Sequence, residues 1–286
     1  MKEVLTDKGV RNQLKPPFFQ ILGIKVNALT LEKAISLVEK GVKSNKQYQI
    51  TTPNPEQIVL AQQNPGFKEV LNHSDLAIPD GVGLVWAMKR QWQSSAARQL
   101  LPVFQSRANE ALSASKTPSR IRRLSGVDLM EALCALAAKK NWRVFLLGGR
   151  EAAEQAAAKL QVASCKLQVR FDSGAKDIKK ETPADRKRII NSINDFRPHL
   201  LFVAYGAPYQ ELWIAKNLPL LRVRVAMSVG GAFDYLSGQV KRAPLILQKM
   251  GLEWLYRLVC QPWRLKRQLA LVKFMWLVMV RKESVK

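Results

Sequence analysis

Short apolar runs, several of them ending in glycine, alternate with segments of helical periodicity along most of this 286-residue chain. This alternation constrains the fold most, because strands that alternate with helices form a parallel sheet covered by helices on both faces. The predicted strands are Ile21–Val26, Tyr48–Thr51, Val144–Leu147, Leu200–Ala204 and Val223–Val229. The predicted helices are Leu31–Val42, Pro55–Gln63, a helix after Gly81 that reaches about Arg90, Val127–Lys139, Glu151–Leu160 and Pro208–Lys216.

Glycines follow three of these strands, at Gly148-Gly149, Gly206 and Gly230-Gly231. Any single one is more often a simple turn, since glycine adopts positive φ without strain. Together they favour a ligand site beyond the carboxyl ends of the strands, where helix N-termini attract phosphate. The chain has neither GxGxxG nor GxxxxGK[ST], which disfavours a dehydrogenase-type dinucleotide site and a P-loop. We therefore predict a Rossmann-like α/β domain over residues 1–250.

The segment Gln91–Ser119 interrupts the alternation with six Ser and five Ala and little periodicity. Such a stretch is typical of an insertion or a mobile loop. We predict no regular structure for residues 91–119.

The charge of the chain favours anionic partners. Its 46 Lys and Arg exceed its 22 Asp and Glu and give a net charge of +24, which attracts nucleic acid, anionic lipid or phosphorylated substrates. Three cysteines without a CxxC pair and two histidines offer little for a disulfide framework, a zinc site or a Ser-His-Asp triad. The first residues lack the apolar core of a signal peptide, so the sequence favours a cytoplasmic location.

The C-terminal segment, residues 251–286, is both basic and apolar. Leu269–Val280 holds eleven apolar residues in twelve, with basic residues on either side. A membrane-spanning helix needs about 20 apolar residues, so this stretch favours a helix that lies at the surface of an anionic membrane. The alternative is a terminal helix that packs on the core with a solvated basic face.

Several short motifs, in their order and spacing, resemble the WecG/TagA/CpsF glycosyltransferases. They are Thr52-Pro53-Asn54-Pro55-Glu56, Pro79-Asp80-Gly81-Val82-Gly83, Arg123-Leu124-Ser125-Gly126-Val127-Asp128-Leu129, Gly206-Ala207-Pro208-Tyr209-Gln210-Glu211, Gly230-Gly231-Ala232-Phe233-Asp234, Lys241-Arg242-Ala243-Pro244 and Gly251-Leu252-Glu253-Trp254-Leu255-Tyr256-Arg257-Leu258. The resemblance runs from about Ile21 to Arg267 and departs from the family in three places. Asp80 and Arg123 are 43 positions apart, further than is usual, and Tyr209 and Ser125 stand where the family has Lys and Thr.

The resemblance implies an inverting, metal-independent enzyme that moves an N-acetylmannosamine-type sugar from a UDP donor to a polyprenyl-diphosphate-linked N-acetylglucosamine. This reaction serves bacterial surface polymers such as teichoic acid. The resemblance also implies a peripheral location on the inner face of the plasma membrane. The apolar tail could equally serve self-association into a homo-oligomer.

By resemblance, Asp80 is the catalytic base, and a buried carboxylate at a strand exit has the raised pKa that a base requires. An Asp that caps the following helix is the alternative. Arg123 resembles the active-site arginine of the family, and Arg257, Arg264 and Arg267 resemble the arginines of its C-terminal appendage. Guanidinium groups suit a departing diphosphate, although each could also be plain surface charge or contact lipid headgroups.

The expected substrate-binding residues are Thr52, Asn54, Gln210 and Glu211, the last of which is alternatively a helix cap. The chain has no Asp-x-Asp pair, so we expect no metal ion, and we expect no cofactor. Two other classes remain open: a basic nucleic-acid-binding protein, favoured by charge and scattered aromatics, and a membrane scaffold that keeps this fold without turnover.

Overall fold

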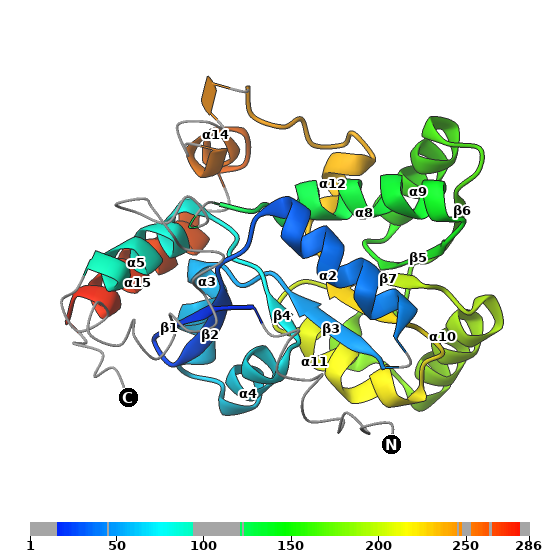
Figure 1. The fold of residues 1–286 in the computed structure, drawn as a ribbon, viewed down its shortest axis with the longest axis horizontal. Helices are drawn as coiled ribbons and strands as arrows, with labels where there is room; N and C mark the ends of the chain where they lie inside the picture. The colour runs from blue at the N-terminus through cyan, green and yellow to red at the C-terminus, as the bar shows by residue number, and fades with distance from the viewer. Residues whose placement is uncertain are drawn as a thin grey trace, which may run out of the picture.

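The computed structural model describes residues 16–44, 46–93, 121, 123–244, 246–247, 253–262 and 265–280. Within this part of the chain, six strands form a parallel sheet in the order β4-β3-β8-β7-β5-β6 (Figure 1). The strands are β3 (Tyr48–Thr51), β4 (Leu76–Ala77), β5 (Arg143–Gly148), β6 (Gln168–Asp172), β7 (Leu200–Ala204) and β8 (Val225–Ser228). The predicted α/β fold with a mainly parallel sheet is confirmed.

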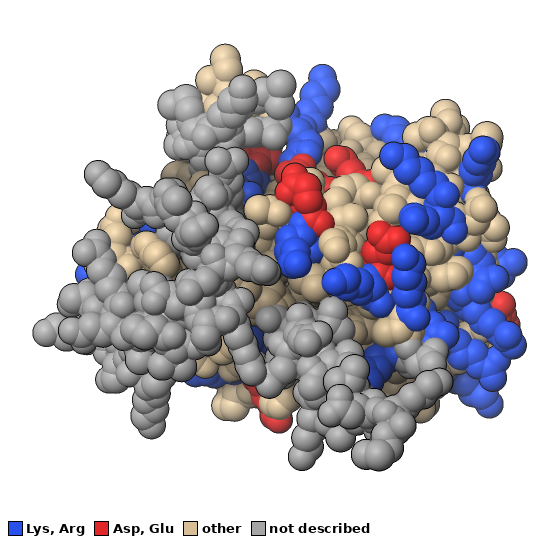
Figure 2. Space-filling view, in the orientation of Figure 1, with Lys and Arg blue, Asp and Glu red and all other residues tan. Residues whose placement is uncertain are grey.

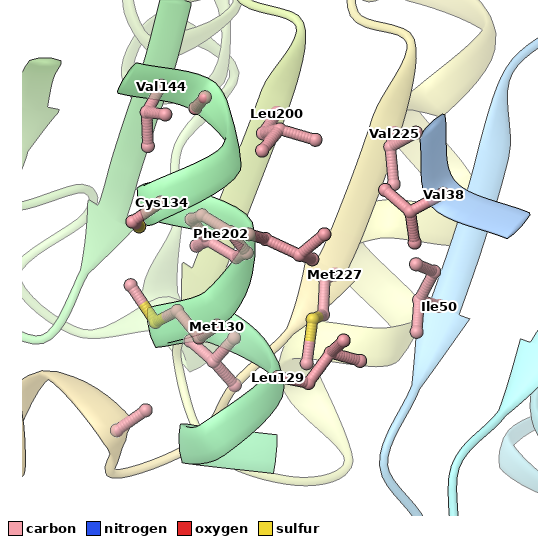
Figure 3. Packing of buried hydrophobic residues seen from close by; sticks show 14 of the residues in the cluster. Val38, Ile50, Leu129, Met130, Cys134, Val144, Leu200, Phe202, Val225 and Met227 are labelled. Carbon is pink, nitrogen blue, oxygen red and sulfur yellow. The ribbon is translucent and has the colours of Figure 1, made fainter. Parts of the chain in front are cut away.

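Helices cover both faces of the sheet, because successive side chains of each strand point to opposite faces. Val144 and Leu146 of β5 pack on one side, while Phe145 and Leu147 pack on the other. The first side carries α2 (Leu31–Lys43), α8 (Gly126–Lys140), α9 (Glu151–Ala163) and α12 (Ala232–Leu236), and Figure 3 shows α8 packing on it. The second side carries α10 (Pro183–Phe196) and α11 (Tyr209–Asn217), with the short turns η1 (Ile178–Lys180) and η2 (Leu218–Leu220) nearby.

A separate apolar cluster lies beside the β4 end of the sheet. Its members come from β1 (Phe18–Ile21), β2 (Ile24–Asn27), α3 (Pro55–Ala61), α4 (Pro65–His73), α5 (Val82–Gln93) and α15 (Leu265–Val280). Phe67, Leu84 and Phe274 are fully buried at its centre. The helix α15 is therefore part of the core, and Figure 1 shows it alongside α5.

The prediction of one strand over Ile21–Val26 is wrong. The chain reverses at Leu22 and Gly23, with φ of 51° and 74°, so β1 and β2 form an antiparallel hairpin outside the main sheet. Two consecutive residues with positive φ are typical of a type I′ hairpin turn, which usually carries Asn-Gly. The Leu-Gly pair hides the turn within an apolar run, and Leu22 is itself buried.

The C-terminal segment forms α14 (Glu253–Cys260) and α15. Along α15, Leu271 and Phe274 face the domain, and Leu271 lies so close that a Cβ at Gly83 would be 2.9 Å from it. The opposite side exposes an apolar stripe at helical spacing, made of Leu265, Leu269, Val272, Trp276 and Met279. No helix among the described residues is both long enough and apolar enough to cross a membrane.

The helix α5 extends into the segment that was expected to have no regular structure. Residues 91–93, expected to open an insertion, instead complete α5, and the remainder of the 91–119 prediction lies outside the described residues.

On the face shown in Figure 2, Lys and Arg gather over the half that carries α2 and α10, with Asp and Glu among them.

Candidate active site

A pocket of about 320 Å³ opens at the carboxyl ends of β3, β4, β7 and β8. The segments that follow these strands line it, together with the first residues of α8 and one side of α14. The lining includes Thr52, Asn54, Asp80, Gly81, Arg123, Ser125, Gly206, Gln210, Gly230, Gly231, Tyr235, Glu253, Trp254 and Arg257. The structure therefore brings together six of the predicted site residues at the predicted edge of the sheet.

Asp80 follows β4. Its backbone N–H donates to the carbonyl oxygen of Pro53 over 3.0 Å, and this bond fixes the position of the residue. Its side chain is 33% exposed and points into the pocket. Burial raises the pKa of Asp80 to about 6, and the negative charges of Glu253 and Asp128 also raise it, whereas Arg123 lowers it. A carboxyl group with this pKa can exchange protons near neutral pH.

Two guanidinium groups face the same space. Arg123 lies with its Nε 4.0 Å from Asp80 Oδ1, and its Nη2 donates to Glu253. Arg257 lies over the Tyr235 ring, 4.8 Å from its centre, with its Nη2 3.9 Å from an oxygen of Asp234.

Several N–H groups of these arginines lack a hydrogen-bond acceptor. Arg123 Nε, Arg257 Nε and Arg257 Nη2 are buried without a partner among the described atoms. Buried polar groups are normally hydrogen-bonded, and an orphaned guanidinium N–H in a pocket matches an anionic ligand. The pocket therefore combines a carboxyl group that can accept a proton with donors that suit an anion.

Thr52 and Asn54 line the pocket and also fix its walls. Thr52 donates its hydroxyl to the carbonyl oxygen of Ser228 over 3.3 Å, which joins the exits of β3 and β8. Asn54 caps α3, accepting the N–H of Gln57 at Oδ1 over 3.0 Å.

Gln210 ties two glycine loops together. Its Oε1 accepts the N–H of Gly206 over 3.1 Å and that of Gly230 over 3.0 Å. The exits of β7 and β8 are thereby held at a fixed separation, and both loops line the pocket. Gln210 therefore fixes the two loops relative to each other and also lines the pocket.

Glu211 lies elsewhere than expected. It is 0% exposed and absent from the pocket lining, and α11 has no side-chain cap, so it neither lines the pocket nor caps the helix. Its Oε1 accepts from the side chains of Gln210 and Gln57 over 2.8 and 3.4 Å. Burial raises the pKa of Glu211, which favours the protonated form. Glu211 thus lies behind the pocket, where its hydrogen bond with Gln210 helps to fix the position of that side chain.

We expect Glu211→Gln to remove a pH dependence of stability. Because the pKa of Glu211 is higher in the folded chain, its contribution is complete at acidic pH and is lost as pH rises, at about 1.4 kcal/mol per pH unit. A Gln amide at position 211 can keep the bonds accepted from Gln210 and Gln57 at its oxygen and can donate to Ser228, and it does not ionise. In thermal melts from pH 5 to 8, the melting temperature of the variant relative to that of the wild type should increase as pH rises. A constant difference would contradict this assignment.

The two remaining predicted arginines cannot be placed in the site. Arg264 lies outside the described residues, and so does the side chain of Arg267, whose backbone belongs to α15.

Glu253 and Arg242 were not predicted as site residues. Glu253 lines the pocket and meets Arg123 from α14, while Arg242 Nη1 lies 2.7 Å from Asp128 at its edge. Both belong to the motif blocks of the sequence, but nothing in those blocks shows that they meet residues more than 100 positions away. Among the described residues, no group of three or more His, Cys, Asp or Glu side chains could hold a metal ion.

The sequence comparisons agree with this geometry. The model described as "Glycosyl transferase WecG/TagA/CpsF family" matches residues 19–112 and 109–286. The fold, the pocket and this match define a glycosyltransferase. The chain belongs to the WecG/TagA/CpsF family. It is also 33% identical, over 82% of its length and 80% of the relative's, to the N-acetylglucosaminyldiphosphoundecaprenol N-acetyl-beta-D-mannosaminyltransferase of Bacillus spizizenii.

Proposed function

We propose that this protein transfers N-acetylmannosamine from a UDP donor to an N-acetylglucosamine linked to a polyprenyl diphosphate. The name of the Bacillus spizizenii relative supports the sugar and the acceptor. The observation that carries the proposal is that one pocket holds Asp80, whose pKa is about 6, and arginine N–H groups that have no hydrogen-bond acceptor in the described part of the chain.

The proposed mechanism is a single displacement. Asp80 takes the proton of the acceptor hydroxyl while the hydroxyl oxygen bonds to the anomeric carbon of the sugar. The bond from that carbon to the UDP oxygen breaks, and its electron pair leaves with the diphosphate. Attack from the side opposite the leaving group inverts the anomeric centre, which agrees with the β linkage in the relative's name.

Arg123 and Arg257 are proposed to stabilise the negative charge that develops on the diphosphate. Their N–H groups provide preorganised donors, which act most strongly in a partly buried site. Metal independence is part of the proposal, because these guanidinium groups supply the charge that a divalent cation otherwise provides. Thr52, Asn54 and Gln210 are proposed to shape the sugar site.

The function is tested by UDP release in EDTA. UDP-N-acetylmannosamine, a soluble lipid-diphosphate N-acetylglucosamine and the purified protein should release UDP, while omission of the acceptor should leave only slow release. UDP-N-acetylglucosamine serves as the matched donor control and should be a poorer substrate. Absence of release with every donor, or release restored only by added Mg²⁺ or Mn²⁺, would contradict the proposal.

We further propose that α15 places the enzyme on an anionic membrane, where a polyprenyl acceptor lies. Its outward stripe is apolar, whereas a solvated helix face is normally polar. The acceptor is itself a lipid, so attachment would bring the pocket, which Leu271 of α15 also lines, near the membrane surface.

Leu269→Gln together with Trp276→Gln should weaken binding to phosphatidylglycerol vesicles at least tenfold. Each large apolar side chain that leaves water contributes about 1.5–3 kcal/mol, and about 1.4 kcal/mol corresponds to a factor of ten. Both side chains are exposed, at 63% and 56%, so the melting temperature should not change. Leu220→Gln, at an equally exposed position on η2, is the matched control. Equal vesicle binding by all three proteins would rule out this surface.

A further inference from the structure

Glu253 connects α14 to the α/β domain. Of the eight residues of α14, all described, only Glu253 is buried, and Leu255 and Val259 are exposed at 41% and 71%. Trp254, Tyr256 and Leu258 are only half-buried, so apolar packing holds this helix less firmly than it holds the core helices. The most buried side chain of α14 is the charged one at its first position.

The Glu253 carboxylate lies between two arginines of the domain. One oxygen accepts from Arg123 Nη2, and the other lies 4.0 Å from Arg242 Nε. Arg242 is held in turn by Asp128, 2.7 Å away. The Glu253 side chain is 11% exposed, so these ion pairs are screened by water much less than surface pairs.

Arg257 lies one helical turn after Glu253, on the same side of α14. Its guanidinium approaches the exit of β8 so closely that a Cβ at Gly231 would be 3.2 Å from Nη2. Since α14 is short and regular, the position of Glu253 determines where Arg257 enters the pocket.

We propose that Glu253 is a positioning residue that fastens α14 to Arg123 and Arg242 and thereby holds Arg257 over the pocket. It acts through the two arginines and does not itself contact the reacting atoms. The inference rests on the proposed function only in taking the ligand of Arg257 to be a diphosphate.

The first test is a double-mutant cycle on UDP binding, measured by calorimetry. Arg257→Ala should weaken UDP binding about tenfold or more in the wild-type background and less than about threefold in the Glu253→Gln background, because the guanidinium is no longer held there. Glu131→Gln is the matched control, since Glu131 also faces Arg242, at 3.9 Å, but lies outside the pocket lining. An equal cost of Arg257→Ala in all backgrounds would overturn the proposal.

The second test needs no ligand. Hydrogen exchange of the α14 amides should accelerate at least tenfold in Glu253→Gln, while the amides of α8 and α11 and the melting temperature change little. Unchanged exchange in α14 would show that Glu253 does not fasten it. Failure of the wild type to bind UDP would contradict the proposed function, and the exchange result would still decide whether Glu253 fastens the helix.

The third readout is the pH profile of kcat/KM. The charged groups that face Asp80 are Arg123, Glu253 and Asp128. Glu253→Gln removes a negative charge and frees Arg123, and both changes lower the pKa of Asp80. The acidic limb should therefore move to lower pH, whereas a purely structural role would leave it in place. An unshifted limb would contradict the contact through Arg123.

Discussion

Asp80→Asn is expected to lower turnover by about 10²–10⁴-fold, the range that a positioned general base contributes. The amide has nearly the same shape as the carboxyl group but cannot accept the proton of the acceptor hydroxyl. Since the pKa of Asp80 is raised to about 6 in the folded chain, its charge does not stabilise the fold at neutral pH. The melting temperature should therefore hold or rise, which separates lost chemistry from lost structure.

The wild-type pH profile offers a second view of the same group. The base must be deprotonated, so kcat/KM should rise as pH passes through about 6 and level off above it. Asp195→Asn, an exposed Asp on α10 outside the active-site lining, is the control and should behave as wild type. Substantial turnover by Asp80→Asn, with the acidic limb unchanged, would assign the base to another residue.

Arg257→Ala is expected to lower kcat by about 10²–10³-fold, the cost of removing one preorganised donor from a developing anion. Its Nε and Nη2 have no hydrogen-bond acceptor among the described residues, which indicates donors that a ligand would satisfy. Arg257→Lys should recover only part of the loss, because an ammonium group cannot offer the planar pair of donors. Steady-state kinetics at saturating donor would measure the effect.

Arg224→Ala is the matched control for Arg257. Arg224 is exposed and directly precedes β8, so it lies at the opposite end of that strand from the pocket. Its loss should change turnover less than twofold. Equal effects of the two substitutions would show that overall charge, and not the position of Arg257, supports activity.

The parts of the fold that the sequence predicted well are those buried on both faces. Leu200–Ala204 and Tyr48–Thr51 were predicted with the bounds of β7 and β3. β7 is a continuous apolar run, as is usual for a central parallel strand, whereas β3 includes Gln and Thr but is still largely buried. The edge strand β6 was missed, since Arg170 and Phe171 are exposed and its sequence is largely polar. The helix α10 was also missed, although Thr182 and Asp185 form a capping box and Pro183 stands at the first helical position, both of which mark a helix start.

The site was predicted in part for a comparable reason. Asp80 and Arg123 could be singled out by motif, and the carboxyl ends of parallel strands necessarily bring such residues to one edge. Arg123 and Glu253 are 130 positions apart, and their pairing depends on how α14 docks on the α/β domain, which no local sequence pattern encodes. Glu211 was predicted to bind substrate or to cap its helix, and its burial could not be predicted, because acidic residues are rarely buried. Three neighbouring amide and hydroxyl side chains, Gln57, Gln210 and Ser228, accommodate it.

The central claim is a single-displacement transfer of N-acetylmannosamine in the pocket of Asp80. Its most direct test is the isolated product of a reaction between UDP-N-acetylmannosamine and a lipid-diphosphate N-acetylglucosamine, examined by mass spectrometry and NMR. The account predicts an acceptor heavier by one N-acetylhexosamine, joined through a β linkage, and formed by the wild type far faster than by Asp80→Asn. An unmodified acceptor, or an α-linked product, would contradict it.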